Sequence, residues 1–448
     1  MLSRSPSSSF SQSLATASSL AFPNGHGTVR LSPRARFSDI PRSIDIPVSA
    51  GDEDEDDENA VVEVDPDMLP EDPTELCTLL ENERSPKQYW MYIALAYAKH
   101  DKVDIAIEII AKGLQAKTHE PMAERLPMLH LLTWLYLERS REAAKNVAGM
   151  NMSQYFLESM LNPHPRAEGS ALISEAKTKD HYLQLATQII NESSRLDPAS
   201  TLVTLARGVY SIFKASVGTV DKNTHMDNAA KIFDDAVRTS RATNMLAIMG
   251  RARVLYGKGR YERALESYQE VLTKRPDMDP DPRIGIGLCC WHLGHKDDAL
   301  VAWERALELD PNSKYAHILK ALYHLHVTSS LSEYDPEFIN NYRLVIEHTQ
   351  KAFKLDKQFP LACTTFASHF FIKRGYSQCE LLAKKAIEYS DVAAVTADGW
   401  FSLARKAHVE GEYEKALGHY KRSDALREGY LPAKLGIGQV QILMKGTF

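Results

Sequence analysis

The fold of this chain is decided by two stretches of sequence, Gly259–Pro276 (GRYERALESYQEVLTKRP) and Gly294–Pro311 (GHKDDALVAWERALELDP). The second matches the first at a displacement of 35 positions, with glycine, alanine, an aromatic residue and proline at equivalent places. Within each stretch the apolar residues recur at spacings of three and four, which is the period of a helix that buries one face. Each proline stands where the helix must end. The two stretches therefore indicate a helical repeat.

The pattern recurs along the chain from about residue 87 onward. Further copies follow Gly411 and surround Ala106 and Ala229. The pattern resembles the tetratricopeptide repeat, a helix–turn–helix unit of about 34 residues. Because one helix pair cannot bury its apolar face alone, neighbouring pairs stack into a superhelix. We therefore expect an all-α fold, a tetratricopeptide-repeat superhelix behind a disordered N-terminal leader.

The repeat core is predicted from small and bulky residues that alternate at fixed places. Small residues let the two helices approach closely, while aromatic residues fill the remaining gaps. The first helix also repeats, because the spacing of Trp90, Ala94 and Tyr97 is that of Trp400, Ala404 and Ala407. The predicted core positions are Trp90, Ala94, Tyr97, Ala106, Ala264, Tyr268, Gly287, Ala299, Trp303, Trp400, Ala404 and Ala416.

The array is expected to occupy residues 87–448 and to hold about eight repeats. Their predicted starts lie near residues 87, 121, 199, 244, 280, 314, 359 and 393. Two insertions are expected, near Val147–Lys179 and Val327–Glu337. The last unit, Leu431–Lys445, is a first helix without a second, whereas such arrays normally end in a polar capping helix. The array is therefore expected to be truncated at the C-terminus.

Charge is distributed unevenly before the array. The formal net charge is −6, yet residues 51–75 hold thirteen acids and no base. The unbroken run Asp52–Glu58 repels itself and stays solvated. We interpret residues 43–86 as an acidic spacer with an extended N-terminal segment. An acidic contact for a basic partner is the alternative interpretation of the run.

Residues 1–42 form a Ser/Arg-rich leader, and residues 1–38 contain no acid. This composition cannot bury enough apolar area to become ordered, so a disordered leader is expected. A misplaced gene start and a transit-like segment are the alternatives.

Several classes of function are disfavoured by the sequence. No window approaches the roughly 18 uninterrupted apolar residues of a membrane-spanning helix, so no membrane partner is expected. The five cysteines fit neither a disulfide scaffold nor a zinc pattern, and a reducing compartment follows. The neighbouring His317, His324 and His326 lack partners at ligand spacing. Gly285-Ile-Gly287 and Gly436-Ile-Gly438 fall where a repeat needs small residues, rather than in a phosphate-binding loop. No catalytic residues, cofactor or metal are expected, and the chain is predicted not to be an enzyme.

The groove of the superhelix is the predicted site of function. It is lined by the first helices of the repeats and suits extended or helical peptides. In the first repeat, the residues out of phase with the core are Gln88, Met91, Leu95 and Lys99. Contact with a partner is one interpretation of these residues, and packing against the next repeat is the other.

Several segments are more specific than a generic repeat. They are Ser43–Pro47 (SIDIP), Val61–Asp65 (VVEVD), Pro73–Asn82 (PTELCTLLEN), Arg251–Tyr256 (RARVLY) and Pro280–Cys289 (PDPRIGIGLC). Together they resemble the tetratricopeptide scaffold subunit of the RNA polymerase II-associated factor (Paf) complex, in a fungal-type version. The resemblance runs from about Ser43 to Lys445 and corresponds to the N-terminal portion of that family.

The resemblance implies a nuclear, non-catalytic scaffold that assembles the Paf elongation complex on RNA polymerase II. It implies support for histone H2B ubiquitylation and histone H3 methylation. The implied partners are the Paf subunit at the N-terminal repeats, a parafibromin-type subunit further along, and RNA polymerase II. The alternation that places Ile44 and Ile46 on one side indicates an extended segment. We expect it to pair or pack with the partner or the first repeats, and a fully disordered leader is the alternative.

Two other classes of function were weighed. A chaperone adaptor would bind the acidic C-terminal tail of a heat-shock protein through converging Lys, Arg and Asn side chains. The helix predicted over Lys87–Lys99 offers no Asn and mostly apolar or aromatic groups. A sequence-specific nucleic-acid reader is weaker still, since the chain after residue 75 carries only +4 and no basic stripe.

Overall fold

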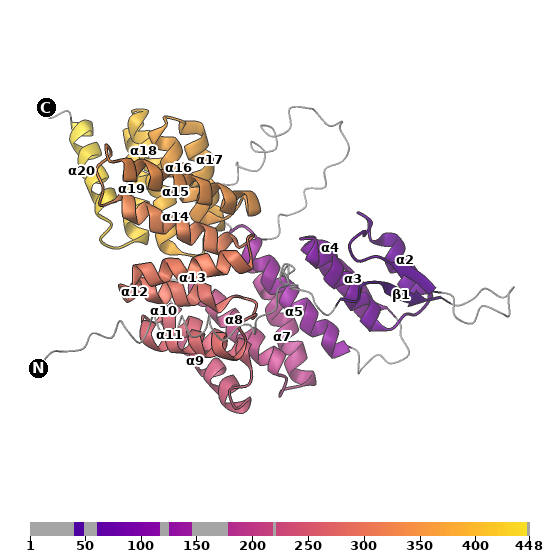
Figure 1. Cartoon of the computed structure of the whole chain (residues 1–448). Coiled ribbons are helices and arrows are strands. Elements are labelled where there is room, and N and C mark those ends of the chain that lie inside the picture. Colours follow the sequence, from indigo (N-terminus) through magenta and orange to yellow (C-terminus); the bar gives the residue numbers. More distant parts are fainter. Residues whose placement is uncertain (1–39, 49–60, 117–124, 146–177, 218–220, 446–448) are drawn as a thin grey trace, which may run out of the picture.

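The computed structural model of this chain describes residues 40–48, 61–116, 125–145, 178–217 and 221–445. These ranges form a superhelix of antiparallel helix pairs, which confirms the predicted fold class (Figure 1). The leader up to residue 39, the acidic run Asp52–Glu58 and most of the first expected insertion lie outside the described residues. Predictions about them are therefore not tested by the structure.

Eight helix pairs follow one another over the described ranges. They are α3 (Lys87–Lys99) with α4 (Val103–Gln115), α5 (Arg125–Glu142) with α7 (Lys179–Leu196), α8 (Thr201–Val217) with α9 (Lys222–Thr239), α10 (Met245–Gly257) with α11 (Tyr261–Lys274), α12 (Pro282–His292) with α13 (Lys296–Leu309), α14 (Lys314–Thr328) with α15 (Pro336–Leu355), α16 (Pro360–Ile372) with α17 (Tyr376–Tyr389), and α18 (Ala393–Val409) with α19 (Tyr413–Leu426). Helix α20 (Leu431–Lys445) follows them. In Figure 1 the pairs from α14 onward lie above those from α8 to α13, with α5 and α7 at the centre.

Close packing between the helices depends on glycine at defined places. A Cβ atom at Gly287 of α12 would overlap the indole ring of Trp303 in α13. One at Gly285 would overlap the ring of Tyr268, which belongs to the preceding pair. These two glycines therefore serve helix packing, and their resemblance to a phosphate loop has no structural basis.

The turn inside a pair uses left-handed backbone. Gly259 and Gly294 have φ of +73° and +90°, a conformation that glycine adopts without steric cost. Arg374 occupies the same kind of turn, between α16 and α17, with φ of +61°. The glycine that opens each quoted repeat stretch is thus the residue that reverses the chain.

The N-terminal segment folds onto the first pair. Strands β1 (Ile44–Pro47) and β2 (Val61–Val64) pair antiparallel, with Ile44 opposite Val64. Helix α2 (Thr74–Asn82) follows, and it buries Cys77 and Leu80. Residues 74–82, at the end of the region 43–86 expected to hold the acidic spacer and the extended segment, are therefore helical. The cause is that Cys77 and Leu80 lie three residues apart, which is helical spacing, and both meet the apolar side of the first pair.

The twelve predicted core positions are all buried. Trp90, Ala94, Tyr97 and Ala106 belong to one apolar cluster with the strands and α2. Ala264, Tyr268, Ala299 and Trp303 form another at the centre of the array. The core is thus a chain of local clusters, each shared by neighbouring helices, as expected for a repeat protein.

Two parts of the superhelix that are distant in sequence also contact each other. Residues just after α5 and at the start of α7 contact the turn between α17 and α18. The backbone N–H of Lys145 donates to the carbonyl of Glu388 at 2.9 Å, and Lys179 forms an ion pair with Asp391 at 2.6 Å. The second pair therefore touches the end of the seventh pair and the turn that follows it, and we call this contact the clasp.

Candidate partner-binding surface

Helix α3 carries the predicted groove residues on a rigid support. Trp90 and Tyr97 are fully buried on one side of the helix. The buried ammonium group of Lys87 donates to the carbonyls of Gly113 and Ala116, and so caps the end of α4. These contacts hold the orientation of α3, and therefore the orientation of its opposite face.

That opposite face mixes exposed polar and half-buried apolar side chains. Gln88 and Lys99 are exposed, whereas Met91 and Leu95 are partly buried. Met91 packs against the first core cluster, and Gln88 donates to the hydroxyl of Tyr92. The four side chains share one face of α3.

Lys99 is already engaged within the chain. Its Nζ lies 2.6 Å from a carboxylate oxygen of Asp67, and this hydrogen bond holds the pKa of Asp67 below its ordinary value. The Nε2–H of His100 donates a hydrogen bond to the carbonyl of Pro66, 3.0 Å away. The segment before α2 is thus tied to the end of α3, so Lys99 is less available to an external carboxylate.

Ile44 and Ile46 lie inside the chain rather than on a partner surface. They are 1% and 0% exposed, and they join the core cluster of Trp90 and Ile93. The segment was expected to pack either with a partner or with the first repeats, and the structure places these two side chains against the first repeat. Strand β1 packs directly on α3. Burial of the two isoleucine side chains there removes their apolar area from water, which stabilises the fold. The exposed valines of the hairpin are Val61 and Val62 on β2, at 57% and 37%.

The buried thiols are poor nucleophiles. All five cysteines are free and buried. Burial raises the pKa of Cys289 and of Cys290 to about 12, and that of Cys363 to about 12. Since the thiolate is the reactive form, these cysteines act as apolar packing groups at neutral pH.

The histidines near α14 bind different partners. His317 and His348 lie with their Nδ1 atoms 3.1 Å apart, whereas His324 contacts Asn341 at 2.8 Å and His326 contacts Lys296 at 2.7 Å. Burial lowers the pKa of His348 to about 4 and also lowers that of His317. Within the described ranges, no group of three His, Cys, Asp or Glu residues is placed to hold a metal ion.

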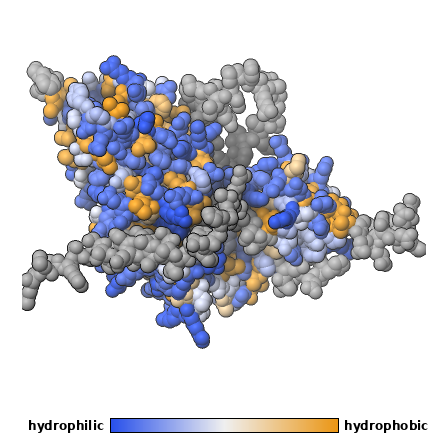
Figure 2. Space-filling model, in the orientation of Figure 1, coloured by the Kyte–Doolittle hydropathy of each residue, from blue (hydrophilic) through white to orange (hydrophobic). Residues whose placement is uncertain are grey.

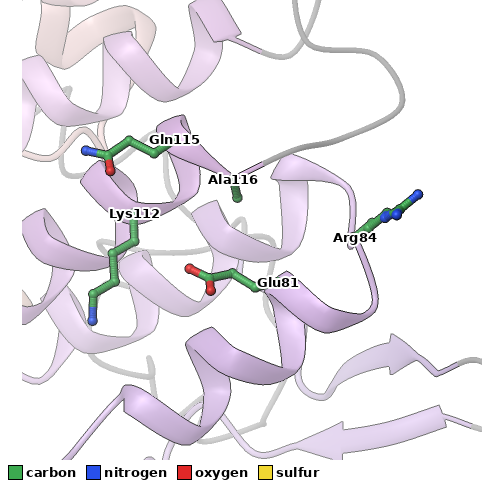
Figure 3. A pocket seen from close by; sticks show the side chains of 5 residues that line it. All are labelled: Glu81, Arg84, Lys112, Gln115 and Ala116. Atoms are coloured by element: carbon green, nitrogen blue, oxygen red, sulfur yellow. The ribbon is translucent and has the colours of Figure 1, made fainter.

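Two surface hollows lie at the edges of the array. One, of about 350 Å³, is lined by Glu81, Arg84, Lys112, Gln115 and Ala116. Figure 3 shows that Glu81 and Lys112 extend toward this space from α2 and α4, whereas Arg84 points away from it. Lys112 is paired with Glu108 at 2.9 Å on its own helix. The hollow thus has charges of both signs but no nucleophile beside a base.

The second hollow, of about 450 Å³, lies at the turn between α10 and α11 and is lined by residues from Gly259 to Arg263 and by Leu293. The coloured part of the face shown in Figure 2 is mostly hydrophilic, with separate hydrophobic patches. In the part of the chain that the structure describes, no helix has both the length and the apolar character to cross a membrane.

Sequence reasoning missed the residues of the clasp. Lys179 is 3% exposed and contacts both carboxylate oxygens of Asp391, while Lys145 lies 3.6 Å from the same carboxylate. No sequence signal pointed to this contact, because its partners are 212 residues apart.

Models of a known protein family match the middle of the array. One described as "Tetratricopeptide repeat" matches residues 255–323, and a second of the same description matches residues 222–279. Both ranges include the stretch Gly259–Pro276, from which the repeat was deduced.

Curated relatives match nearly the whole chain. "Tetratricopeptide repeat protein 1" of Schizosaccharomyces pombe is 32% identical over 86% of this chain and 34% of its own length. "RNA polymerase-associated protein CTR9" of Saccharomyces cerevisiae is 29% identical over 90% of this chain and 34% of its own. "Protein CTR9 homolog" of Arabidopsis thaliana is 25% identical over 84% and 31%. The chain spans about a third of the length of these relatives. The matches confirm the resemblance to the scaffold subunit family, and none of these names indicates an enzyme.

Proposed function

We propose that this chain, a relative of the CTR9 proteins, acts as a non-catalytic scaffold of a Paf-type elongation complex in the nucleus. The observation that carries this proposal is the 29% identity to an RNA polymerase-associated protein over 90% of the chain. A superhelix with a continuous set of first helices is suited to such a role, since it presents one long surface to several proteins.

The mechanism we propose is placement rather than chemistry. Subunits held on one stiff support meet each other at a high effective concentration, without any reaction on the support itself. RNA polymerase II, the Paf subunit and a parafibromin-type subunit are the proposed partners. Histone H2B ubiquitylation and H3 methylation would be supported because the responsible factors are gathered on the polymerase.

The proposed contact for the Paf subunit is the groove face of α3. Its half-buried Met91 and Leu95 offer apolar area, and exposed Gln88 offers hydrogen bonds beside it. Methionine adapts its shape to a partner more readily than branched residues do. Because Trp90 and Tyr97 fix the helix from behind, the surface is organised before binding, which lowers the entropic cost of association.

Co-expression with the Paf subunit tests this proposal. The double change Met91→Glu with Leu95→Glu should weaken co-purification at least about tenfold, because two charges would be desolvated at the contact. Gln88→Arg adds bulk on the same face without entering the core, and it should also weaken co-purification with the Paf subunit. Ile339→Glu is the matched control, since Ile339 is 62% exposed on α15, a second helix of its pair.

Two results would contradict the proposal. One is unchanged co-purification with both groove variants while their thermal unfolding matches that of the unmodified chain. The other is the absence of a complex with the Paf subunit together with binding of a heat-shock C-terminal tail peptide in calorimetry. The second result would favour the chaperone adaptor. The pairing of Lys99 with Asp67 disfavours that function, because it makes this lysine less available to a carboxylate of the tail peptide.

A further inference from the structure

Arg405 in α18 is held in an aromatic environment. The central carbon of its guanidinium lies 4.3 Å from the ring centroid of Phe371 and 4.9 Å from that of Phe401. Phe371 comes from α16, so the stack joins the first helices of two successive pairs. Stacking on the faces of aromatic rings fixes the plane of a guanidinium without using its N–H donors.

Within the described residues, the buried Nε–H donor of Arg405 has no hydrogen-bond acceptor, and the side chain forms no ion pair or other hydrogen bond. The next residue, Lys406, pairs with both Glu380 and Glu410, at 2.7 Å and 2.9 Å. Asp398, on the same helix as Arg405, lies 3.4 Å from Arg427 instead. A buried N–H group is normally hydrogen-bonded, so the partnerless Nε–H of this partly buried arginine needs an explanation.

The position of Arg405 in its repeat places it on the groove face. Phe401 and Arg405 follow Trp400 by one and five residues, as Met91 and Leu95 follow Trp90. Trp400 and Ala404 are buried between the helices, whereas Phe401 and Arg405 are only partly buried. The guanidinium therefore belongs to the same surface as the groove residues of the first repeat, seven pairs further along.

Apolar side chains are exposed beside it. Ile372, which follows Phe371, is 68% exposed, and Val409, one helical turn after Arg405, is 55% exposed. We call Phe371, Ile372, Phe401, Arg405 and Val409 the arginine groove. It combines one unpaired cation with four apolar side chains, a combination complementary to a peptide with one acid among apolar residues.

We propose that Arg405 recognises the carboxylate of an aspartate or glutamate in a partner peptide whose flanking residues are apolar. The guanidinium has a planar set of donors that matches a carboxylate in two parallel hydrogen bonds, and the phenylalanine rings limit the access of water to them. The recognition is a property of the seventh and eighth pairs, and it does not require the partner to be a Paf-complex subunit.

Fluorescence polarisation on the full chain tests this proposal. The probe is a labelled pool of 12-residue peptides with a central glutamate between leucine and phenylalanine residues. Matched pools carry glutamine or phosphoserine at the centre. The unmodified chain should bind the glutamate pool about tenfold more tightly than the glutamine pool, which is the size of effect expected for a charge-assisted pair.

Variants assign the effect to the arginine. Arg405→Met should abolish the preference for glutamate, because it keeps an unbranched apolar stem but removes the charge and the donors. Arg405→Lys should reduce the preference, since an ammonium lacks the planar fork. Arg422→Met is the matched control, and this variant should keep the preference for glutamate. Arg422 also stacks on an aromatic ring, 4.7 Å from the centroid of Trp400, but it lies on α19, a second helix.

Three results would overturn the proposal. The first is equal binding of the glutamate and glutamine pools to the unmodified chain, or a preference for glutamate that survives in Arg405→Met. The second is tight binding of the phosphoserine pool alone, which would assign the site to phosphate. The third is a thermal midpoint of Arg405→Met clearly below that of Arg422→Met, which would give Arg405 a structural role instead.

Discussion

Lys179 and Asp391 are 212 residues apart in sequence, yet Nζ of Lys179 lies 2.6 Å and 2.7 Å from the two carboxylate oxygens of Asp391. Lys179 is 3% exposed and Asp391 is 23% exposed, so the pair is largely shielded from water. It fixes the second helix pair against the turn between the seventh and the eighth. A repeat array in which each pair contacted only its neighbours would have no such constraint.

Asp391→Asn should destabilise the clasp strongly. Removing one partner of a buried ion pair leaves the other charge unpaired, which costs about 3 kcal/mol. Hydrogen exchange should show faster opening at the ends of α5 and α7 and at the turn between α17 and α18. The control is Asp235→Asn, because its ion pair with Arg238 is exposed and contributes about 0.5 kcal/mol or less. Equal protection in both variants would show that the clasp does not hold the superhelix closed.

Gly287→Ala should destabilise the fifth helix pair. The added Cβ would overlap the indole of Trp303, and overpacking of this kind costs about 1–3 kcal/mol. Gly418→Ala in α19 is the matched control, since nothing lies within 4 Å of a Cβ atom there. Alanine should stabilise that helix by up to about 1 kcal/mol. Urea unfolding followed by circular dichroism measures both changes. A stabilising Gly287→Ala would show that the two helices are not packed this closely.

Gly294 and Arg374 both have left-handed backbone, and substitutions at the two positions should change stability in opposite directions. Gly294→Ala should cost about 1 kcal/mol, because alanine is strained at φ of +90°. Arg374→Gly should be neutral or stabilising by up to about 1 kcal/mol, since arginine already bears this strain at φ of +61°. Thermal unfolding of the two variants measures the contrast. The assignment of these turns would be wrong if both changes shifted the midpoint in the same direction.

Acid should weaken the contact between α14 and α15. Burial lowers the pKa of His348 to about 4, below its ordinary value near 6.5, so the unfolded chain binds a proton first as the pH falls. The contribution of His348 to stability is therefore full above pH 6.5 and is lost as the pH falls toward 4. Between pH 7.5 and pH 5 the loss amounts to about 2 kcal/mol.

His348→Gln should remove this part of the pH dependence. The neighbouring charged groups Lys320, Lys351 and Glu347 remain in the variant, so the difference between the two unfolding curves reports His348 together with its contact with His317. His326→Gln is the control, because His326 is exposed at the end of α14. The same pH dependence in the unmodified chain and in His348→Gln would exclude this origin.

The helix pairs and their core could be predicted from the sequence because both depend on local patterns. The spacing of Trp90, Ala94 and Tyr97 within one helix determines which side is buried, and no distant contact is needed to see it. The left-handed turns at Gly259 and Gly294 are local features too, because they depend on the backbone freedom of one glycine each. Fold class and repeat spacing therefore followed from the sequence.

Contacts between distant elements could not be predicted in this way. Alternation at Ile44 and Ile46 indicated a strand, but alternation alone does not say whether the apolar side meets a partner or the chain itself. The pairing of Lys179 with Asp391 depends on how far the superhelix turns over several repeats, which no single repeat specifies.

Arg405 is an intermediate case. Its interval from Trp400 equals that of Leu95 from Trp90, so the repeat pattern already placed it on the groove face. Its lack of an acceptor could be recognised only when the neighbouring carboxylates had been located.

The most direct measurement is affinity capture of the tagged chain from nuclear extract, with quantitative mass spectrometry of the bound proteins. We expect enrichment of Paf-complex subunits together with RNA polymerase II, reduced by Met91→Glu with Leu95→Glu and retained with Ile339→Glu. Recovery of heat-shock chaperones without Paf-complex subunits or the polymerase would contradict the proposed function.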